Sequence, residues 1–423
     1  MEKHKHVGWL LVLLLCSALA VRAQVQAPLT EVSHVQTEPD GRFFVNGTPV
    51  FPIGFTQGPP TGAVASNGLN AMQELREEGF AFQQWQCPKG AWGPAKEAEL
   101  DALLKEAAEE GMHVAIWIAD LVEINPSDTA HLAELKRVVT KYHNSPALFL
   151  WKGADEPQWG KVPVDHLQPF DDTVHALDRD HPVWITQAPR GTAADLEPYS
   201  KYFDVGAIDL YPVSYPPGMH SGNGNLGLSA VGDYTLLIRK AMDFQKPAMM
   251  TMQICFSGVI KPGKRLRFPT FPDERYMSYQ AIIDGAHGLL YFGGNLRPCL
   301  NDRDAGYGWN WTFYDNVLRP VLDELRPGSP LYPALIAPKS SLRIQSDGGS
   351  GLEYTVREAG DYIYLLAAKR EGDTVQVNFS GLPENISTGE VLYEAPRHVA
   401  VSKGQFTDWF GPNEVHVYRF RKP

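Results

Sequence analysis

The sequence contains few of the residues and motifs on which several enzyme classes depend. It has only 4 cysteines in 423 residues, and none forms the CxxC spacing of a zinc or redox site. There is no GxSxG motif of a serine esterase, no glycine fingerprint for a dinucleotide after the first predicted strand, and no phosphate-binding loop. Internal repeats and low-complexity tracts are also missing. These absences disfavour a serine esterase, a nucleotide-dependent enzyme and a repeat protein.

Basic residues are outnumbered by acidic ones. The chain has 38 Lys and Arg against 49 Asp and Glu, which gives a net charge of −11 at pH 7. Nucleic acids and anionic membranes are bound by basic faces, so neither is expected as a partner. Hydrophobic residues make up 43% of the chain and charged residues 21%, which is typical of a globular protein and excludes a disordered one. The 10 tryptophans are an excess that suggests a function.

Only one long apolar run is present, and it lies at the N-terminus. Residues 7–20, VGWLLVLLLCSALA, follow Lys3 and Lys5 and precede the small residue Ala23. This pattern is typical of a secretory signal peptide that is cleaved after Ala23, and the run is short for a membrane span. An uncleaved membrane anchor is the alternative. We therefore predict a signal peptide over 1–23 and a secreted or periplasmic protein without membrane contact after cleavage.

Neither the cysteines nor the histidines form a pattern of metal ligands. Cys87, Cys255 and Cys299 remain after signal cleavage, and this odd number allows at most one internal disulfide, whose pairing the spacing does not decide. His220 and His287 are isolated, and most other histidines fall on predicted helices or loops. We expect surface or capping histidines rather than ligands. The sequence predicts no metal and no cofactor.

Apolar strands alternate with helices through most of the chain. A hairpin is expected over 41–50, with Asn46-Gly47 at its turn. Eight strands follow, each continuously apolar as in a parallel sheet buried on both faces. They are expected at 50–55, 80–86, 113–118, 147–151, 182–186, 205–211, 248–254 and 288–293. Helices are expected at 71–78, 96–110, 128–143, 164–179, 195–201, 229–244, 273–286 and 313–325.

Eight such units predict an α/β fold, a (β/α)8 TIM barrel, with a doubly wound open sheet as the alternative. After Pro338 the pattern changes to short alternating strands separated by Gly, Asn and Asp, which predicts an all-β sandwich. The expected organisation is an N-terminal extension and hairpin over 24–49, a barrel over 50–337 and a C-terminal β-sandwich over 338–423. The oligomeric state is not predicted.

The end of the fourth strand carries the most informative segment, FLWKGADEPQW at 149–159. Side chains at the carboxyl ends of barrel strands line the active-site mouth of this fold. Asp155 and Glu156 would therefore present two acids at the mouth, a composition suited to proton transfer to a sugar leaving group. Shielding by Trp159 would raise the pKa of Glu156 and keep it protonated. The alternative is that both acids cap the next helix.

Other strand ends carry residues suited to sugar binding. Indole faces stack on the C–H faces of pyranose rings, and amides and carboxylates bind hydroxyl groups. The candidate substrate-binding residues are Trp85, Gln86, Trp159, Gln187, Tyr211, Gln253, Tyr291, Asn295 and Trp309. Asp209, at the end of the sixth strand, is a candidate catalytic acid. A carbohydrate is the expected partner, although any single Trp is more often a packing residue.

Several segments carry a family resemblance. GRFFVNGTPVFPIGF, ALFLWKGADEPQW, YMSYQAIIDGAHGLLYFGG and the tail GQFTDWFGPNEVHVYRF resemble corresponding parts of clan A glycoside hydrolases, the TIM-barrel retaining glycosidases. The likeness spans nearly the whole mature chain and implies hydrolysis of O-glycosidic bonds, with Glu156 as general acid/base. Two positions depart from the family pattern. Asp155 stands where the family has Asn, and Gln253 stands where it has the nucleophilic Glu of strand seven.

A neutral amide cannot be the nucleophile of a retaining mechanism, so three hypotheses stay open. The first is substrate assistance, because adjacent Asp and Glu on strand four resemble the pair of family 20 hexosaminidases. There, Asp155 would orient an acetamido group, with Tyr211 or Tyr291 bonding its oxygen. The second is an inverting mechanism with Asp209 as base, followed by Asp120, Asp302 and Asp304 as further candidates. The third is a barrel that binds glycans without cleaving them.

Overall fold

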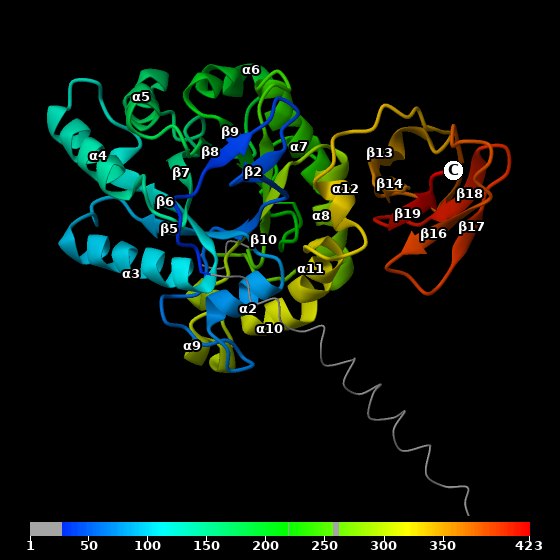
Figure 1. The fold of residues 1–423 in the computed structure, drawn as a ribbon, viewed down its shortest axis with the longest axis horizontal. Helices are drawn as coiled ribbons and strands as arrows, with labels where there is room; N and C mark the ends of the chain where they lie inside the picture. Colours follow the sequence, from blue (N-terminus) through cyan, green and yellow to red (C-terminus); the bar gives the residue numbers. More distant parts are fainter. Residues whose placement is uncertain (1–27, 219, 257–261) are drawn as a thin grey trace, which may run out of the picture.

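The chain forms a closed barrel of eight parallel strands surrounded by helices, followed by two antiparallel sheets (Figure 1). The computed structural model describes residues 28–218, 220–256 and 262–423, so the predicted signal peptide lies outside the described residues. The barrel strands are β4 (Ile53–Phe55), β5 (Phe82–Cys87), β6 (His113–Ile118), β7 (Leu148–Asp155), β8 (Val183–Gln187), β9 (Val205–Asp209), β10 (Ala248–Gln253) and β11 (Gly288–Phe292). Their order around the barrel is the order of the sequence, which confirms the predicted (β/α)8 fold.

Helices follow the barrel strands and form the outer layer. They are α2 (Ala71–Glu77), α3 (Pro94–Glu110), α4 (Thr129–Tyr142), α5 (Gln168–Leu177), α6 (Ala193–Leu196), α7 (Ala230–Ala241), α8 (Phe271–Ile283), α9 (Asp302–Tyr307), α10 (Trp311–Phe313), α11 (Arg319–Leu325) and α12 (Tyr332–Leu335). Shorter turns are η1 (Ala119–Leu121), η2 (Val164–His166), η3 (Glu197–Tyr202), η4 (Arg297–Cys299), η5 (Tyr314–Leu318) and η6 (Gly349–Gly351). No helix in the described ranges combines the length and hydropathy needed to cross a membrane.

Helix ends follow the local signals of the sequence. Asp128 caps α4 by accepting a hydrogen bond from the backbone N–H of His131 at 3.1 Å. Gly111 ends α3 with a φ of 74°, a left-handed conformation that glycine adopts without steric cost. The helix expected over 313–325 is interrupted instead, with the π-helical turn η5 between α10 and α11. Pro320 lies at this break, and proline lacks the N–H that a continuous helix requires.

The N-terminal hairpin lies before the barrel and closes one of its ends. Strands β1 (Val35–Thr37), β2 (Phe43–Val45) and β3 (Thr48–Val50) form an antiparallel sheet. Asn46 and Gly47 have φ angles of 49° and 75°, as a two-residue type I′ turn requires, which confirms the predicted hairpin. Phe43 stacks on Phe149 of β7 with ring centroids 6.3 Å apart, so the hairpin packs onto the barrel interior.

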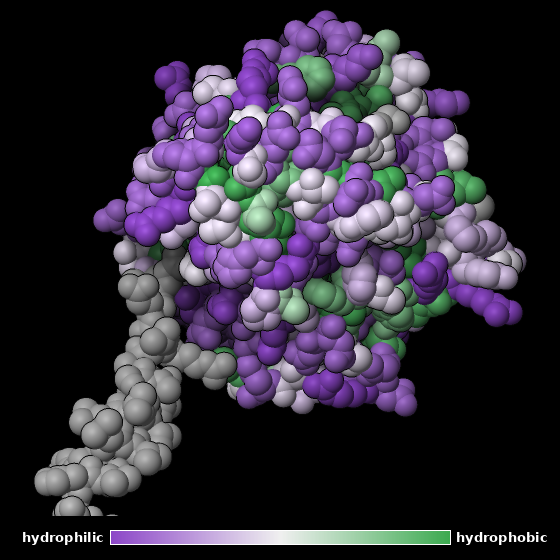
Figure 2. Space-filling model, turned by 90° about the vertical axis from the view of Figure 1, so that its right-hand side faces the viewer, coloured by the Kyte–Doolittle hydropathy of each residue, from purple (hydrophilic) through white to green (hydrophobic). Residues whose placement is uncertain are grey.

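The C-terminal strands form a two-layer β unit. One sheet contains β13 (Leu352–Ala359), β14 (Tyr362–Lys369), β19 (Val415–Arg421), β16 (Thr388–Leu392) and β17 (His398–Ala400), and the other contains β12 (Gln345–Ser346), β15 (Val375–Ser380) and β18 (Gln405–Phe410). Leu365 of β14, Phe379 of β15 and Phe406 of β18 share one core cluster, which confirms the β-sandwich. The five-stranded sheet also packs on α8. The side of the molecule on which this β unit lies is mainly hydrophilic (Figure 2).

Candidate active site

A bulge at the end of β7 sets the position of the two adjacent acids. The pairing of β7 with β8 shifts in register between Lys152 and Asp155. A Cβ at Gly153 would lie 3.0 Å from Ile185, so a larger residue would disturb this close packing. Bulges redirect the side chains that follow them. Glu156 then has a φ of 49°, in the left-handed region that is strained for a non-glycine residue and that occurs most often at functional positions.

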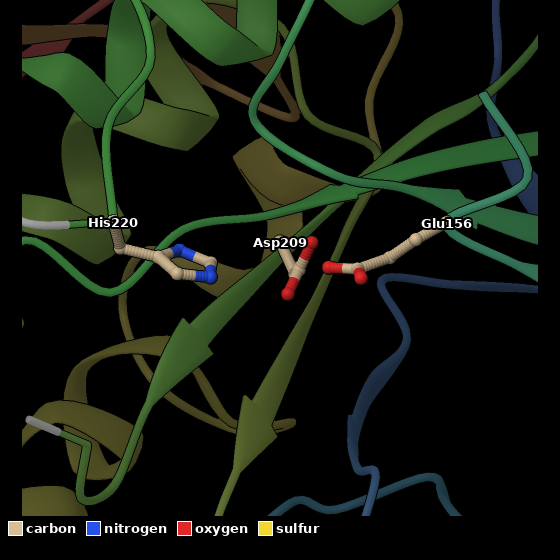
Figure 3. Close-up of side chains that lie close together, drawn as sticks. All are labelled: Glu156, Asp209 and His220. Atoms are coloured by element: carbon tan, nitrogen blue, oxygen red, sulfur yellow. The ribbon is translucent and has the colours of Figure 1, made fainter. Parts of the chain in front are cut away.

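The carboxyl groups of Glu156 and Asp209 face one another across the end of the barrel, with the His220 ring on the far side of Asp209 (Figure 3). One oxygen of each carboxyl and one ring nitrogen of His220 lie within 4.8 Å of one another. Asp209 is the last residue of β9 and only 7% exposed, whereas Glu156 is partly exposed. The Asp209 Oδ1 atom has no hydrogen-bond partner among the described residues. The geometry therefore brings together two of the three predicted catalytic residues.

Burial raises the pKa of both carboxyl groups. For Asp209 the loss of hydration is the largest cause, and the charges of Glu156 and Asp155 raise its pKa further, well above the usual range. For Glu156 burial is again first and the charge of Asp155 second, while a hydrogen bond to Asp209 and the charges of Lys152 and Arg190 lower the pKa. Two neighbouring carboxyls in such surroundings do not both ionise readily. The pair therefore retains a proton at higher pH than isolated acids would, as a proton donor requires.

A buried lysine supports the acidic segment from inside the barrel. Lys152 is 1% exposed, and its Nζ lies 2.9 Å from Asp155 Oδ1 and 3.1 Å from the carbonyl oxygen of Ala154. The same ammonium group lies 4.9 Å from the centre of the Trp184 ring. Asp155 is thus held by an ion pair, and its side chain is 49% exposed. Sequence analysis assigned no role to Lys152, although a lysine inside an apolar strand is itself a signal of a buried ion pair.

Aromatic rings surround the Asp209 side of the site. Tyr211 stacks on His220 at 4.4 Å and on Phe292 at 5.0 Å between ring centroids, and Phe256 lies at 4.8 Å. The backbone N–H of Tyr211 donates to His220 Nδ1 at 3.3 Å. The interpretation of His220 as a surface or capping residue is therefore wrong. It lies in a long loop after β9, where no motif marks it.

The Glu156, Asp209 and His220 trio also has the donor types and the spacing of a divalent-cation site. Two carboxylate oxygens and an imidazole nitrogen are ligands that several transition metals accept. The sequence predicted no metal because His220 is isolated along the chain. The same three side chains therefore fit two kinds of chemistry, and a chelator distinguishes them.

Gln253 is occupied by the backbone of a neighbouring loop. Its Oε1 accepts a hydrogen bond from the N–H of Val213 at 2.8 Å, and its Nε2 donates to the carbonyl oxygen of Val213 at 2.8 Å. The side chain is fully buried. The prediction that Gln253 binds substrate is wrong, because both polar atoms are paired and no surface is accessible. Its amide instead fastens the loop after β9 to the end of β10.

Three other predicted binding residues are buried against the outer layers of the barrel. Trp85 is 6% exposed, and its indole N–H donates to Glu99 of α3 at 3.0 Å. Tyr291 is fully buried and bonds Ser278 of α8 at 2.9 Å. Trp309 is also fully buried, in a cluster with Phe55, Trp311 and Tyr314. The predictions for Trp85, Tyr291 and Trp309 are wrong, because these side chains pack on other parts of the chain.

The remaining predicted binding residues lie at or after strand ends, and their contact with a substrate stays a prediction. Trp159 is 61% exposed in the loop after β7, and Gln86 is partly exposed near the end of β5. Gln187, the last residue of β8, is 1% exposed, yet its Nε2 has no hydrogen-bond partner among the described residues. Asn295 is exposed and donates to the carbonyl oxygen of Gly58 at 3.3 Å. Tyr211, with 5% exposure, contacts the site through its ring.

A disulfide links two loops on the same end of the barrel. Cys255 follows β10 and is bonded to Cys299 of η4, which follows β11. Cys87, at the end of β5, is buried and free. One disulfide and one thiol agree with the expected limit, and the structure supplies the pairing that the spacing did not.

Known structures share this architecture at low sequence identity. No family model and no curated protein sequence matches the chain. A structure described as a glycoside hydrolase superposes with a TM-score of 0.60 and 15% identity, covering 94% of this chain and 99% of that chain. A family 5 glycoside hydrolase from Bacteroides vulgatus gives 0.59 and 12%, covering 94% and 95%. The α-amylase of Geobacillus thermoleovorans, complexed with acarbose, gives 0.54 and 13%, covering 92% and 99%. At the level of the fold, these similarities confirm the resemblance to TIM-barrel glycoside hydrolases.

Proposed function

We propose that this protein is an exported glycoside hydrolase that cleaves O-glycosidic bonds with Glu156 as proton donor and Asp209 as the second carboxylate. The observation that carries this proposal is the facing pair at the carboxyl ends of β7 and β9, with donor atoms within 4.8 Å and raised pKa values. Glycoside hydrolysis generally uses two acids flanking the bond, one of them protonated at working pH. The fold of the structural neighbours agrees with this chemistry without identifying its residues.

The spacing of the pair disfavours inversion of configuration. Inverting enzymes separate their carboxyl groups by about 6.5–9.5 Å to admit a water, and retaining enzymes by about 5–5.5 Å. The approach of Glu156 and Asp209 within 4.8 Å is shorter than the inverting range. In this scheme the pair holds one proton, which burial places on Asp209 and which passes to Glu156 along the hydrogen bond between them when substrate binds. Glu156 then protonates the leaving oxygen while ionised Asp209 attacks the anomeric carbon. Glu156 then removes a proton from the water that hydrolyses the glycosyl ester.

The ion pair of Asp155 bears on the acetamido-assisted scheme. In that scheme Asp155 would hold the acetamido N–H, but its carboxylate is bonded to Lys152 at 2.9 Å. The partly exposed carboxylate has lone pairs to spare, so the choice between the schemes rests on substrate preference. Faster cleavage of N-acetylated aryl glycosides would favour assistance, and faster cleavage of plain ones would favour Asp209 as nucleophile.

The deciding experiment compares the wild type with Glu156→Gln on a panel of plain and N-acetylated aryl glycosides. Loss of a general acid typically lowers the rate by about 10²–10⁴-fold, and we expect that loss here with oligosaccharide binding retained. Glu123→Gln is the matched control, because Glu123 is a partly buried acid after β6 that is not part of the trio. Equal activity of wild type and Glu156→Gln would refute the role of Glu156. Binding by both proteins without cleavage by either would indicate a glycan-binding barrel.

Two further measurements test the remaining parts of the proposal. Proton NMR of the first product should show the anomer of the substrate, as the scheme with Asp209 as nucleophile requires. Hydrolysis should be unaffected by EDTA, and a loss that zinc restores would assign the Glu156, Asp209 and His220 trio to a metal instead. Export is tested by N-terminal sequencing of protein from the periplasm or medium, where we expect the chain to begin at Gln24.

A further inference from the structure

A cavity of about 260 Å³ lies at the other end of the barrel from Glu156. Its wall contains residues 39–42 of the hairpin, 50–51 before β4, and 285–287 before β11. The C-terminal β unit closes it with residues 337–339, 355, 357 and 366. Because these barrel segments precede their strands, the cavity opens at the amino-terminal end, away from the candidate active site. Three parts of the fold meet at this cavity.

The wall of the cavity is strongly basic in an acidic protein. Only one carboxylate lines it, Asp40. The cationic side chains are Arg42, Arg239, Lys246, Lys339 and Arg357. The whole chain carries a net charge of −11, so this local excess of positive charge is opposite in sign to the molecule. Like charges gathered around one cavity repel one another, and a bound anion would offset that repulsion.

Two of the cations are satisfied within the protein. Arg42 forms an ion pair with Asp40 at 2.7 Å, which uses the single carboxylate of the wall. Lys246 donates to the carbonyl oxygen of Ser200 at 2.7 Å and lies 5.2 Å from the Phe203 ring. These contacts direct both charges to groups of the protein. The excess positive charge therefore lies on Arg239, Lys339 and Arg357.

Arg239, Lys339 and Arg357 form no ion pair within 4.0 Å in the part of the chain that the structure describes. Arg239 donates to the backbone carbonyl of Asp284 at 2.8 Å, and Arg357 donates to Thr355 Oγ1 at 2.7 Å. Each guanidinium carries five N–H donors, so these contacts leave further donors on both. The three side chains come from α7, from the segment after α12 and from β13.

Mutual repulsion of these groups is visible in their proton affinities. The pKa of Arg357 is lowered to about 10, by burial first and then by the charge of Arg239. The pKa of Lys339 is also lowered, by burial first and then by Arg357 and Arg239. His287 in the same wall has a pKa of about 4, because of burial and then Arg239, and is uncharged at neutral pH. A bound anion would oppose the part of these shifts that comes from the neighbouring positive charges.

We propose that the cavity bounded by Arg239, Lys339 and Arg357 binds a tetrahedral oxyanion, a phosphate or sulfate group. Guanidinium groups offer paired N–H donors whose geometry matches the oxygens of such groups, and Lys339 adds a mobile charge. The volume exceeds that of one oxyanion, so it also accommodates the organic part of a phosphate ester. Binding joins the barrel and the β unit through one ligand. The site is separate from the proposed hydrolysis and does not depend on it.

The test uses the mature full-length protein in a buffer free of phosphate. Titration calorimetry and thermal melts are run with inorganic phosphate, sulfate and a hexose phosphate, with chloride at equal ionic strength as the reference. We expect saturable binding of one phosphate per chain and a melting temperature that rises with phosphate but not with chloride. Tighter binding of the hexose phosphate than of inorganic phosphate would identify an ester as the ligand. No saturable heat, or an equal rise with chloride, would overturn the proposal.

Variants separate an anion site from a structural arginine. Arg357→Gln should abolish the phosphate response, and without phosphate it should melt no lower than the wild type because it removes repulsion from Arg239. Arg239→Gln should behave alike if Arg357→Gln fails to fold. Lys240→Gln is the matched control, since Lys240 is exposed on the same helix and lies outside the wall. An unchanged phosphate response in both arginine variants would overturn the assignment.

Discussion

Replacing Gln253 with glutamate tests whether this position is a lost nucleophile or part of the fold. The variant would supply the carboxylate that the resemblance to retaining glycosidases places on strand seven. The structure predicts no gain, because the side chain is fully buried and both of its polar atoms are bonded to Val213. A carboxylate cannot donate to the carbonyl oxygen of Val213. It would instead set a negative charge against that oxygen in a site without water.

The cost can be worked out from these contacts and depends on pH. In its ionised form the new side chain loses the hydrogen bond to the buried carbonyl, which costs about 1–3 kcal/mol, whereas its protonated form can still donate an O–H to that oxygen. The new acid can avoid a buried charge only by staying protonated, so its pKa in the folded state lies above the unfolded value of about 4.3. Stability is then lost as the pH rises above that value, at about 1.4 kcal/mol per unit until the folded pKa is reached. Between pH 5 and pH 7 the additional loss is about 2–3 kcal/mol.

Urea denaturation of the wild type and Gln253→Glu at pH 5 and pH 7 measures this difference. Gln253→Met is the control, because it removes both hydrogen bonds without adding an ionisable group and should show a loss that is independent of pH. Hydrolysis of aryl glycosides by Gln253→Glu should not exceed that of the wild type. A variant as stable as the wild type at pH 7, with a tenfold higher rate, would show that residue 253 faces the substrate and would refute the reasoning.

Three further outcomes follow from other contacts. Asp209→Asn should raise stability at pH 7 but not near pH 3, because an acid whose folded pKa is raised destabilises the fold above its unfolded pKa of about 3.9; urea melts at both pH values check it. Lys152→Met should shift the basic limb of the kcat/KM profile to higher pH, since the lysine charge lowers the pKa of Glu156; an unshifted limb would contradict that influence. Replacing Cys255 and Cys299 by serine, 44 residues apart, should lower the free energy of unfolding by about 2–4 kcal/mol; reduction of the wild type should match it.

Most of the barrel was predictable because its signals are local. The apolar runs of the strands and the Asn46-Gly47 turn each act within a few residues and lie where the sequence indicates. The strand ending at Asp155 was expected to stop at residue 151. The difference arises from the bulge between β7 and β8, which continues the pairing past a glycine. A bulge depends on the partner strand, which a reading of one segment does not include.

Within the site, the two facing carboxyl groups lie at strand ends that the sequence predicted, whereas His220, on a loop, was missed. Glu156 and Asp209 were identified because the carboxyl ends of parallel strands meet at one edge of a barrel. His220 reaches the site from a loop whose path depends on tertiary packing, including the contact of Val213 with Gln253. Lys152 was overlooked although it lies only four residues before Glu156. Its charge is buried in the barrel, where partners come from the strand end and from Trp184.

The errors at Trp85 and Tyr291 have one physical cause, which is the direction of side chains on a strand. Successive side chains point to opposite faces, and strands buried on both faces give no polar alternation to tell the faces apart. In the structure Phe82 and Leu290 lie in the barrel interior, so Trp85 and Tyr291, an odd number of residues away, point to the helices. Asp209 lies an even number of residues from the interior residue Ala207, so its side chain points inward. In a strand without a bulge, one interior residue therefore suffices to assign the direction of every other side chain, and the sequence lacked that reference.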